Sequence, residues 1–243
     1  MLSYFNGSTI AKTGNKVLHL NDKEDEDGFT DIHLKTGGFT LMPDKTAERT
    51  IFYITAPSGS GKSYLAKEII HEYHKMYPKR EVYVFSSLDS DPTLDSLKYI
   101  KRIKLNKPEF METELSAEDF KDSLVLMDDI DVISDKKKLK KVQDILNSIL
   151  QTGRHFQVSC IYTSHQSTAG HSTKIILCEA HVIVIYPSTS GGKMMKYLLD
   201  QYLGFSKSQI EKVKDLKSRW LAIVRKYPRC LVWQNGASLL KNF

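Results

Sequence analysis

A short stretch near residue 60 constrains the fold of this chain more than any other part of the sequence. An apolar run at residues 51–54 leads into Ala-Pro-Ser-Gly-Ser-Gly-Lys-Ser at residues 56–63, and a helix-like run follows at 64–76. A strand, a glycine-containing turn that ends in Lys-Ser, and a helix make the layout of a phosphate-binding P-loop. The stretch therefore predicts a nucleotide site carried on an α/β fold.

Each part of this loop has a chemical reason. Gly59 and Gly61 let backbone N–H groups point inward around a triphosphate. Lys62 is expected to reach the β- and γ-phosphates, and the Ser63 hydroxyl to ligate Mg²⁺. Ala56 stands where the full pattern has its first glycine, and a chance Gly/Ser turn before a helix is the alternative interpretation. The predicted nucleotide-binding residues are Pro57, Ser58, Gly59, Ser60, Gly61, Lys62, Ser63 and Tyr64.

Composition places the chain among globular proteins. Of its 243 residues, 41% are hydrophobic and 26% charged, which suits one large α/β domain with a substantial core. The three cysteines are far apart and form no CxxC pair, so we expect a reducing compartment. No apolar run approaches the length of a membrane span, so we expect a soluble protein with no membrane partner. The net charge of +6 favours a polyanionic partner, of which nucleic acid is the commonest.

Strand-like and helix-like runs alternate through most of the chain. Strands are expected at 50–55, 81–85, 123–127, 157–163 and 180–186, and helices at 64–76, 137–151, 193–202 and 208–216. Residues 94–122 are expected to form short helices and one short strand, and 220–225 with 229–234 a terminal hairpin. This alternation predicts a mostly parallel sheet with helices on both faces. Residues 1–48 are expected to form a small β extension, with a hairpin of 29–34 and 38–42, ahead of a P-loop domain over 49–243.

A second acidic motif follows an apolar strand. Leu-Val-Leu-Met at 124–127 ends in Asp128 and Asp129, which is the pattern of a Walker B motif. Asp128 is expected to hold Mg²⁺, and Asp129 to orient and polarise the attacking water. A strand that ends in an exposed acidic turn is the alternative. The upstream P-loop favours the Walker B interpretation.

Three further features each admit two interpretations. Arg154, after Gly153 at the end of the helix at 137–151, is either an arginine finger that reaches a neighbouring subunit's nucleotide or a surface charge at a helix end. Gln166 ends the strand after Walker B, where a γ-phosphate sensor fits, with Thr163, Ser164 and His165 beside it; an ordinary polar loop is the alternative. The lysine-rich run at 136–141 is either a grip on DNA phosphates or a solvated helix face.

Taken together, the motifs resemble those of a known superfamily. ITAPSGSGKSYLAKEII, LVLMDDID, ILNSILQTGRHFQVSCIYTSHQ and IILCEAHVIVIYPS are similar to the FtsK–HerA superfamily, and most of all to its poxvirus-type genome-packaging ATPases of large DNA viruses and virophages. The likeness covers residues 48 to 235. Ala56, and Asp129 in place of the usual Glu, depart from the family pattern.

The resemblance implies a specific function. It implies a P-loop (RecA/FtsK-like) ATPase that uses ATP and Mg²⁺, with Arg154 as a finger in trans and Asp129 and Gln166 as catalytic groups. It implies a homo-oligomeric ring of five or six subunits around double-stranded DNA, a capsid vertex protein as partner, and a virion or a cytoplasmic virus factory as location. The alternatives are a HerA-like helicase or translocase, a nucleotide kinase, and a DNA-binding scaffold that uses ATP as an assembly switch. The order of motifs excludes a GTPase.

Overall fold

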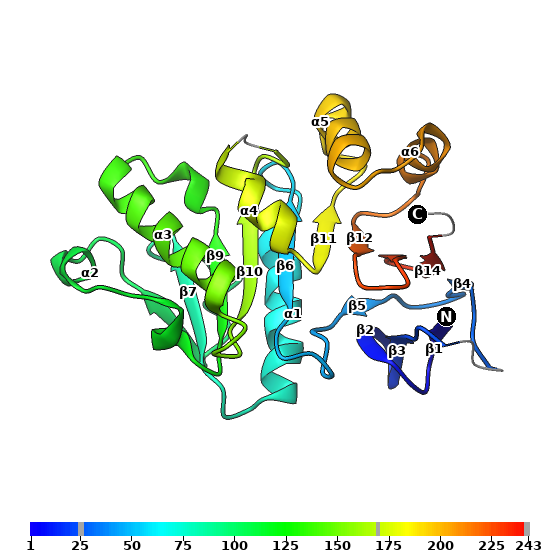
Figure 1. Ribbon diagram of the computed structural model, residues 1–243, viewed down its shortest axis with the longest axis horizontal. Coiled ribbons are helices and arrows are strands. Elements are labelled where there is room, and N and C mark those ends of the chain that lie inside the picture. The colour runs from blue at the N-terminus through cyan, green and yellow to red at the C-terminus, as the bar shows by residue number, and fades with distance from the viewer. Residues whose placement is uncertain (24–26, 169–170, 241–243) are drawn as a thin grey trace.

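The computed structural model of this protein describes residues 1–23, 27–168 and 171–240. Its centre is a sheet with six parallel strands: β6 (Ile51–Thr55), β7 (Val82–Ser86), β8 (Ile100–Ile103), β9 (Leu124–Asp128), β10 (Ser159–Ser164) and β11 (Val182–Ile185). Four antiparallel strands extend one side of this sheet: β12 (Leu221–Val224), β13 (Cys230–Trp233), β14 (Gly236–Leu239) and β4 (Asp31–His33). The order across the sheet is β4-β14-β13-β12-β11-β6-β10-β9-β7-β8 (Figure 1).

The helices are α1 (Lys62–Met76), α2 (Pro108–Glu112), α3 (Lys136–Thr152), α4 (His171–Glu179), α5 (Gly192–Tyr197) and α6 (Lys207–Lys214). Short 3-10 helices lie at Ala117–Phe120 and Ile130–Val132, and a π-helical turn at Leu198–Tyr202 continues α5. A separate small sheet has the order β1-β3-β2-β5, with β1 (Leu2–Ser3), β2 (Ser8–Thr13), β3 (Lys16–Leu20) and β5 (Thr40–Leu41). The predicted fold class, a mostly parallel sheet flanked by helices with small N-terminal strands and a C-terminal hairpin, is confirmed.

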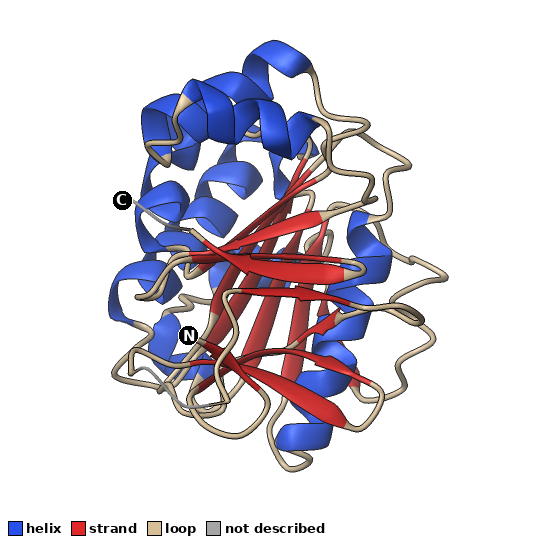
Figure 2. Ribbon diagram, turned by 90° about the vertical axis from the view of Figure 1, so that its right-hand side faces the viewer, coloured by secondary structure: helices blue, strands red, loops and turns tan. Residues whose placement is uncertain are grey.

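The central strands are apolar along their whole length because both faces of the sheet are covered. Every residue of β6, β9, β10 and β11 is buried, as is typical of parallel strands between two layers of helices. One face packs on α1 and the small N-terminal sheet. The other face packs on α3, α4, α5 and α6. Figure 2 shows the sheet between these layers.

The N-terminal extension differs from the predicted hairpin. Residues 29–34 and 38–42 do not pair with each other: β4 pairs with β14, and β5 pairs with β2. Between them the chain follows the turn after β13, where Phe39 N donates to Gln234 O at 2.6 Å. A side chain at Gly38 would lie 3.0 Å from that same carbonyl, so glycine permits the approach. The hairpin was wrong because both of its strands find partners far away in the sequence. The boundary between residues 48 and 49 stays a prediction.

The remaining predicted elements lie within a few residues of the observed ones. The helix after the P-loop begins at Lys62, because the loop's lysine is already its first helical residue. No sequence pattern predicted α4 or β14. Among the described residues, no helix has the length and apolar character that crossing a membrane requires.

Candidate active site

The P-loop has the backbone that phosphate binding needs. Gly59 and Gly61 have φ angles of 75° and 102°, a region that side chains strongly disfavour. Gly61 immediately precedes α1 and makes no side-chain cap, so the first N–H groups of the helix stay available to an anion. The structure confirms the predicted succession of strand, glycine turn and helix around Lys62.

The strand order brings the second motif to the same edge of the sheet. β10 lies between β6 and β9, so one strand separates the P-loop from the Walker B strand. The register aligns Ser164 with Thr55 across β10 and β6, and Asp128 with Ser86 across β9 and β7. The carboxyl ends of these strands therefore meet, and the residues that follow β10 lie between the two motifs.

Asp128 is a buried carboxylate with two hydroxyl partners. It is 2% exposed, and it accepts hydrogen bonds from Thr163 Oγ1 at 3.0 Å and Ser86 Oγ at 3.2 Å. Burial and the neighbouring Asp129 carboxylate raise the pKa of Asp128, although both hydroxyls oppose the shift. A divalent cation would reverse this penalty on the charged form, and hard oxygen ligands suit Mg²⁺. The Asp128 carboxylate thus fits the predicted Mg²⁺, and Ser63, the other predicted ligand, is the second residue of α1.

Asp129 is held in an uncommon backbone conformation. Its φ of 45° lies in the left-handed region, which Asp tolerates better than most residues. Its backbone N–H donates to Thr163 Oγ1 at 2.9 Å, which fixes this turn against β10. The turn aims the carboxylate back over the sheet edge, 3.6 Å from Lys62 Nζ.

His165 occupies the space between the two motifs. Its Nδ1 lies 3.2 Å from Lys62 Nζ, and its Nε2 lies 3.1 Å from Asp129 Oδ2. Lys62 also donates to the carbonyl of Ala56 at 3.1 Å and is only 5% exposed. Lysine, histidine and aspartate therefore form a continuous chain across the edge of the sheet.

Gln166, the predicted sensor, is placed differently from its neighbour. The residue is exposed, and its backbone carbonyl accepts from Tyr53 Oη at 2.7 Å and from Ser164 Oγ at 3.0 Å. These bonds fix the loop through the backbone of an exposed residue. The structure brings Lys62, Asp128, Asp129 and His165 together, and Gln166 contributes its backbone to the same loop.

Three groups at the P-loop were missed by sequence reasoning. Arg219 Nε donates to Ser60 O at 3.2 Å, and its guanidinium lies 3.1 Å from the position of a side chain on Gly61. Tyr186 Oη donates to Gly61 O at 3.1 Å, and Thr189 Oγ1 lies 3.0 Å from Ser60 Oγ. Tyr186 and Thr189 follow β11, and Arg219 precedes β12. No local motif predicts that these residues lie at the P-loop, because only the strand order brings them there.

A cavity of about 340 Å³ opens beside the P-loop. Tyr64 and Arg219 line one part of it, and Gly38, Phe39 and Gln234 another. The size and mixed lining are those of small-molecule sites. Residues 37–40 of the N-terminal extension thus line a cavity beside the P-loop.

Arg154 lies at the opposite end of the sheet. It follows Gly153, the C-cap of α3, whereas His165 follows the other end of β10. The six residues of β10 separate them by roughly 20 Å. Arg154 is 70% exposed and pairs with Glu48, and this pairing lowers the pKa of Glu48. Arg154 therefore cannot reach the nucleotide site of its own chain.

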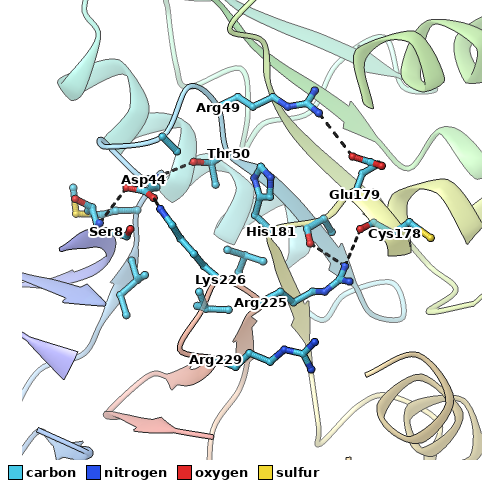
Figure 3. Close-up of a pocket in the computed structure, with 17 residues that line it drawn as sticks. Ser8, Asp44, Arg49, Thr50, Cys178, Glu179, His181, Arg225, Lys226 and Arg229 are labelled. Atoms are coloured by element: carbon cyan, nitrogen blue, oxygen red, sulfur yellow. Dashed lines mark hydrogen bonds and ion pairs between the residues drawn. The ribbon is translucent and has the colours of Figure 1, made fainter. Parts of the chain in front are cut away.

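The same amino-terminal end of the strands holds a second cavity, of about 460 Å³ (Figure 3). Arg49 donates to the carbonyls of Ile149 and Leu150 at 2.6 and 2.7 Å, at the end of α3. Arg225 donates to three carbonyls at the end of α4, and Lys226 pairs with Asp44 at 2.7 Å. These cations of the cavity are thus engaged within the chain.

His181 stands at the centre of this cavity. Its Nδ1 accepts from the backbone of Ile51 at 3.1 Å, which requires an unprotonated nitrogen there. Burial, with Arg49, Lys226 and Arg225 nearby, lowers the pKa of His181 to about 4. The cavity therefore keeps a neutral histidine among cations.

Comparison with known proteins agrees with this arrangement. The model of the ATPase family associated with various cellular activities (AAA) matches residues 52–201. An uncharacterized protein, V3, of the Sputnik virophage is 37% identical over 227 residues, which cover 93% of this chain and 90% of that protein. The residues that the family model matches include the P-loop, Asp128, Asp129 and Arg154.

Solved structures share the fold. The DNA-packaging ATPase B204 of Sulfolobus turreted icosahedral virus aligns with a TM-score of 0.52 and 18% identity, over 81% of this chain and 98% of that one. The cytoplasmic domain of the type VII secretion ATPase EccC of Thermomonospora curvata aligns with a TM-score of 0.54 and 12% identity, over 93% of this chain and 28% of that one. The predicted resemblance to viral packaging ATPases is confirmed in the fold.

Proposed function

This chain belongs to the AAA family of ATPases, and on that premise we propose that it is a ring-forming motor that drives double-stranded viral DNA into a capsid. ATP is its nucleotide, and hydrolysis of ATP is its reaction. The observation that carries the motor proposal is the separation of the site into two halves. The phosphate-binding and water-activating groups lie at one end of the sheet, and Arg154 lies at the other.

The residues at the carboxyl end suit ATP hydrolysis. Lys62 would leave the Ala56 carbonyl and His165 for the β- and γ-phosphates, since a triphosphate offers a stronger acceptor. Ser63 and Asp128 would hold Mg²⁺, which would neutralise charge on the phosphates. Asp129 would orient the attacking water and take its proton. Tyr64, Gly38 and Gln234 would enclose the base in the adjacent cavity.

Arg154 supports an assembly of identical subunits. A ring built head to tail would place the amino-terminal end of one sheet against the carboxyl end of the next. Arg154 would then exchange Glu48 for the γ-phosphate held by the neighbour, where such a cation accelerates transfer. We therefore propose that Arg154 acts as a finger in trans, in a ring of five or six subunits.

Charge supports DNA as the cargo. The chain has a net charge of +6. The first turns of α3 expose Lys136, Lys137 and Lys140, whereas Lys138 and Lys141 bond to Asn106 and to the carbonyls of Met111 and Thr113. The exposed lysines would grip phosphates without reading sequence. The likeness to a virophage protein and to B204 supports a capsid vertex as docking partner, and a virion or virus factory as location.

The test is ATPase activity with and without duplex DNA, measured together with the mass of the assembly. We expect a ring of five or six subunits whose phosphate release rises with duplex DNA and falls with added salt. The matched control is Lys62→Ala, which is expected to bind DNA without turnover. If the rate of ATP hydrolysis depended neither on duplex DNA nor on the assembly state, the protein would be an ATPase but not a DNA motor. Phosphate transfer to an added nucleotide would instead indicate a kinase.

A further inference from the structure

The chain of contacts through His165 has a consequence for the water-activating carboxylate. We propose that His165 is a positioning residue for Asp129, fixing its carboxylate for attack on the γ-phosphate. The inference rests on ATP hydrolysis and is independent of DNA as cargo.

The hydrogen bonds fix the tautomer of His165. Lys62 is a donor only, so the ring nitrogen 3.2 Å from its Nζ, Nδ1, must be the acceptor. The proton of the neutral ring then lies on Nε2, which donates to Asp129 Oδ2 at 3.1 Å. A neutral imidazole therefore points one defined donor at one defined carboxylate oxygen.

The loop behind the imidazole is itself anchored. The His165 backbone N–H donates to Asp131 Oδ2 at 3.2 Å, and the Ser164 hydroxyl shares its single proton between this oxygen and the Gln166 carbonyl, both at 3.0 Å. Asp131 belongs to the turn that follows Walker B, so β10 and β9 are tied together just beyond the site. His165 consequently reaches Asp129 from a backbone that has little freedom.

Asp129 needs such support. Its side chain is one methylene shorter than that of glutamate, and its backbone already holds a left-handed turn. Thr163 Oγ1 lies 3.2 Å from Asp129 Oδ1, but its single proton is shared with Asp128, which lies closer at 3.0 Å. His165 supplies the dedicated donor. With Oδ2 occupied by the imidazole, Oδ1 is the oxygen left to receive the proton of the attacking water.

The reaction itself balances without any proton transfer to or from His165. The water oxygen forms a bond to Pγ, the bond from Pγ to the bridging oxygen breaks, and ADP keeps that electron pair. The water proton passes to Asp129. When Lys62 moves onto the phosphates, His165 loses one contact and keeps the other, so Asp129 stays in place while the nucleotide is bound.

Two substitutions separate the two nitrogens. In His165→Gln the amide nitrogen reaches the position of Nε2 and still donates to Asp129. In His165→Asn the shorter amide reaches only the position of Nδ1, beside Lys62. We expect His165→Gln to retain kcat within about threefold, and His165→Asn and His165→Ala to lose about 30-fold, within the range typical of acid–base positioning. KM for ATP should change less than about twofold, since a positioning defect acts on the chemical step.

A double-mutant cycle identifies the residue through which His165 acts. Asp129→Ala alone should abolish most turnover, and adding His165→Ala should lower it no further, because the two groups act as one unit. His71→Gln, an exposed histidine on α1, is the matched control and should match wild type. Nucleotide affinity and thermal midpoint, measured on every variant, report whether folding is intact.

The outcomes are distinct. Loss in Asn and Ala with retention in Gln, together with a non-additive cycle, supports the positioning role. Equal losses in Gln and Asn, additive losses with Asp129→Ala, or a raised KM with unchanged kcat overturn it. All assays are run with and without duplex DNA: a wild type that hydrolyses ATP but ignores DNA refutes the motor, and still allows His165 to be judged.

Discussion

The two ends of the central sheet carry similar side chains and use them in opposite ways. At the carboxyl end, Lys62 and Asp129 lie 3.6 Å apart with His165 bridging them, in a site open to a ligand. At the amino end, Arg49 and Arg225 donate hydrogen bonds to backbone carbonyls at the ends of helices. We propose that the first arrangement exchanges partners when a nucleotide binds. The second arrangement keeps its hydrogen-bond partners and stabilises the fold.

The direction of the helices explains the difference. The N-terminus of α1 presents free N–H groups at the carboxyl end of the sheet, and these attract an anion. The C-termini of α3 and α4 present carbonyls at the amino end, and these attract cations of the chain itself. Arg154 is the exception at the amino end, because it is exposed and its partner, Glu48, is exposed too. An exposed ion pair is weak and therefore exchangeable.

The largest effect is expected at the carboxyl end. Lys62→Ala removes the cation that meets the phosphates, and we expect kcat/KM for ATP to fall about 10³-fold. The thermal midpoint should change by only a few degrees. Phosphate release and thermal unfolding measure the two quantities. A wild-type rate in this variant would remove Lys62 from the site.

Substitution of Arg154 should impair turnover, as substitutions at the carboxyl end of the sheet do, although Arg154 lies at the amino end. We expect Arg154→Ala to lower kcat of the assembled protein by about 10²-fold or more, with ATP binding retained. Arg154→Lys keeps the charge without the guanidinium fork, so its kcat should lie between those of Arg154→Ala and the wild type. Fluorescent-nucleotide binding and steady-state turnover measure the outcome. If Arg154→Ala lost stability and kept its activity, Arg154 would be a residue that stabilises the fold, like Arg49.

Arg49 should show the reverse pattern. Arg49→Met leaves buried carbonyls of α3 without their charged donor, and we expect the free energy of unfolding to fall by about 3 kcal/mol. The folded fraction should hydrolyse ATP at the wild-type rate. Urea unfolding of this variant is compared with Lys45→Met, an exposed neighbour. Impaired turnover at unchanged stability would contradict the division between the ends.

The smallest effect concerns pH. The folded-state pKa of His181 is about 4, below the ordinary value of 6.5, so the unfolded chain binds more protons between these values. Its contribution to stability is complete above pH 6.5 and is lost as the pH falls towards 4. Between pH 7 and pH 5 this amounts to about 2 kcal/mol. We expect urea unfolding of His181→Asn, whose amide oxygen can still accept from Ile51, to lose this part of the pH dependence. An identical slope in both proteins would contradict it.

Local sequence patterns determined the centre of the fold and much of the site. The P-loop and the pair Asp128 and Asp129 depend on contiguous residues, and both lie where the patterns put them. The pairing of strands in the N-terminal extension was not predicted, because β4 pairs with β14 and β5 with β2, and the two do not pair with each other. Arg219 joins the site through the strand order, and no sequence motif predicted it. His165 lies in the polar run that the sequence placed beside Gln166, but its contacts with Lys62 and Asp129 depend on the direction of the loop.

The most direct test of the account is a mixture of two inactive proteins. Lys62→Ala keeps its Arg154, and Arg154→Ala keeps its Lys62, so a ring assembled from both contains interfaces with every group intact. Random mixing in equal parts makes about one quarter of the interfaces complete. We expect DNA-stimulated ATP hydrolysis in the mixture up to about this fraction of the wild-type rate, well above the rate of either variant alone. No recovery at any mixing ratio, in assemblies shown to contain both variants, would contradict it.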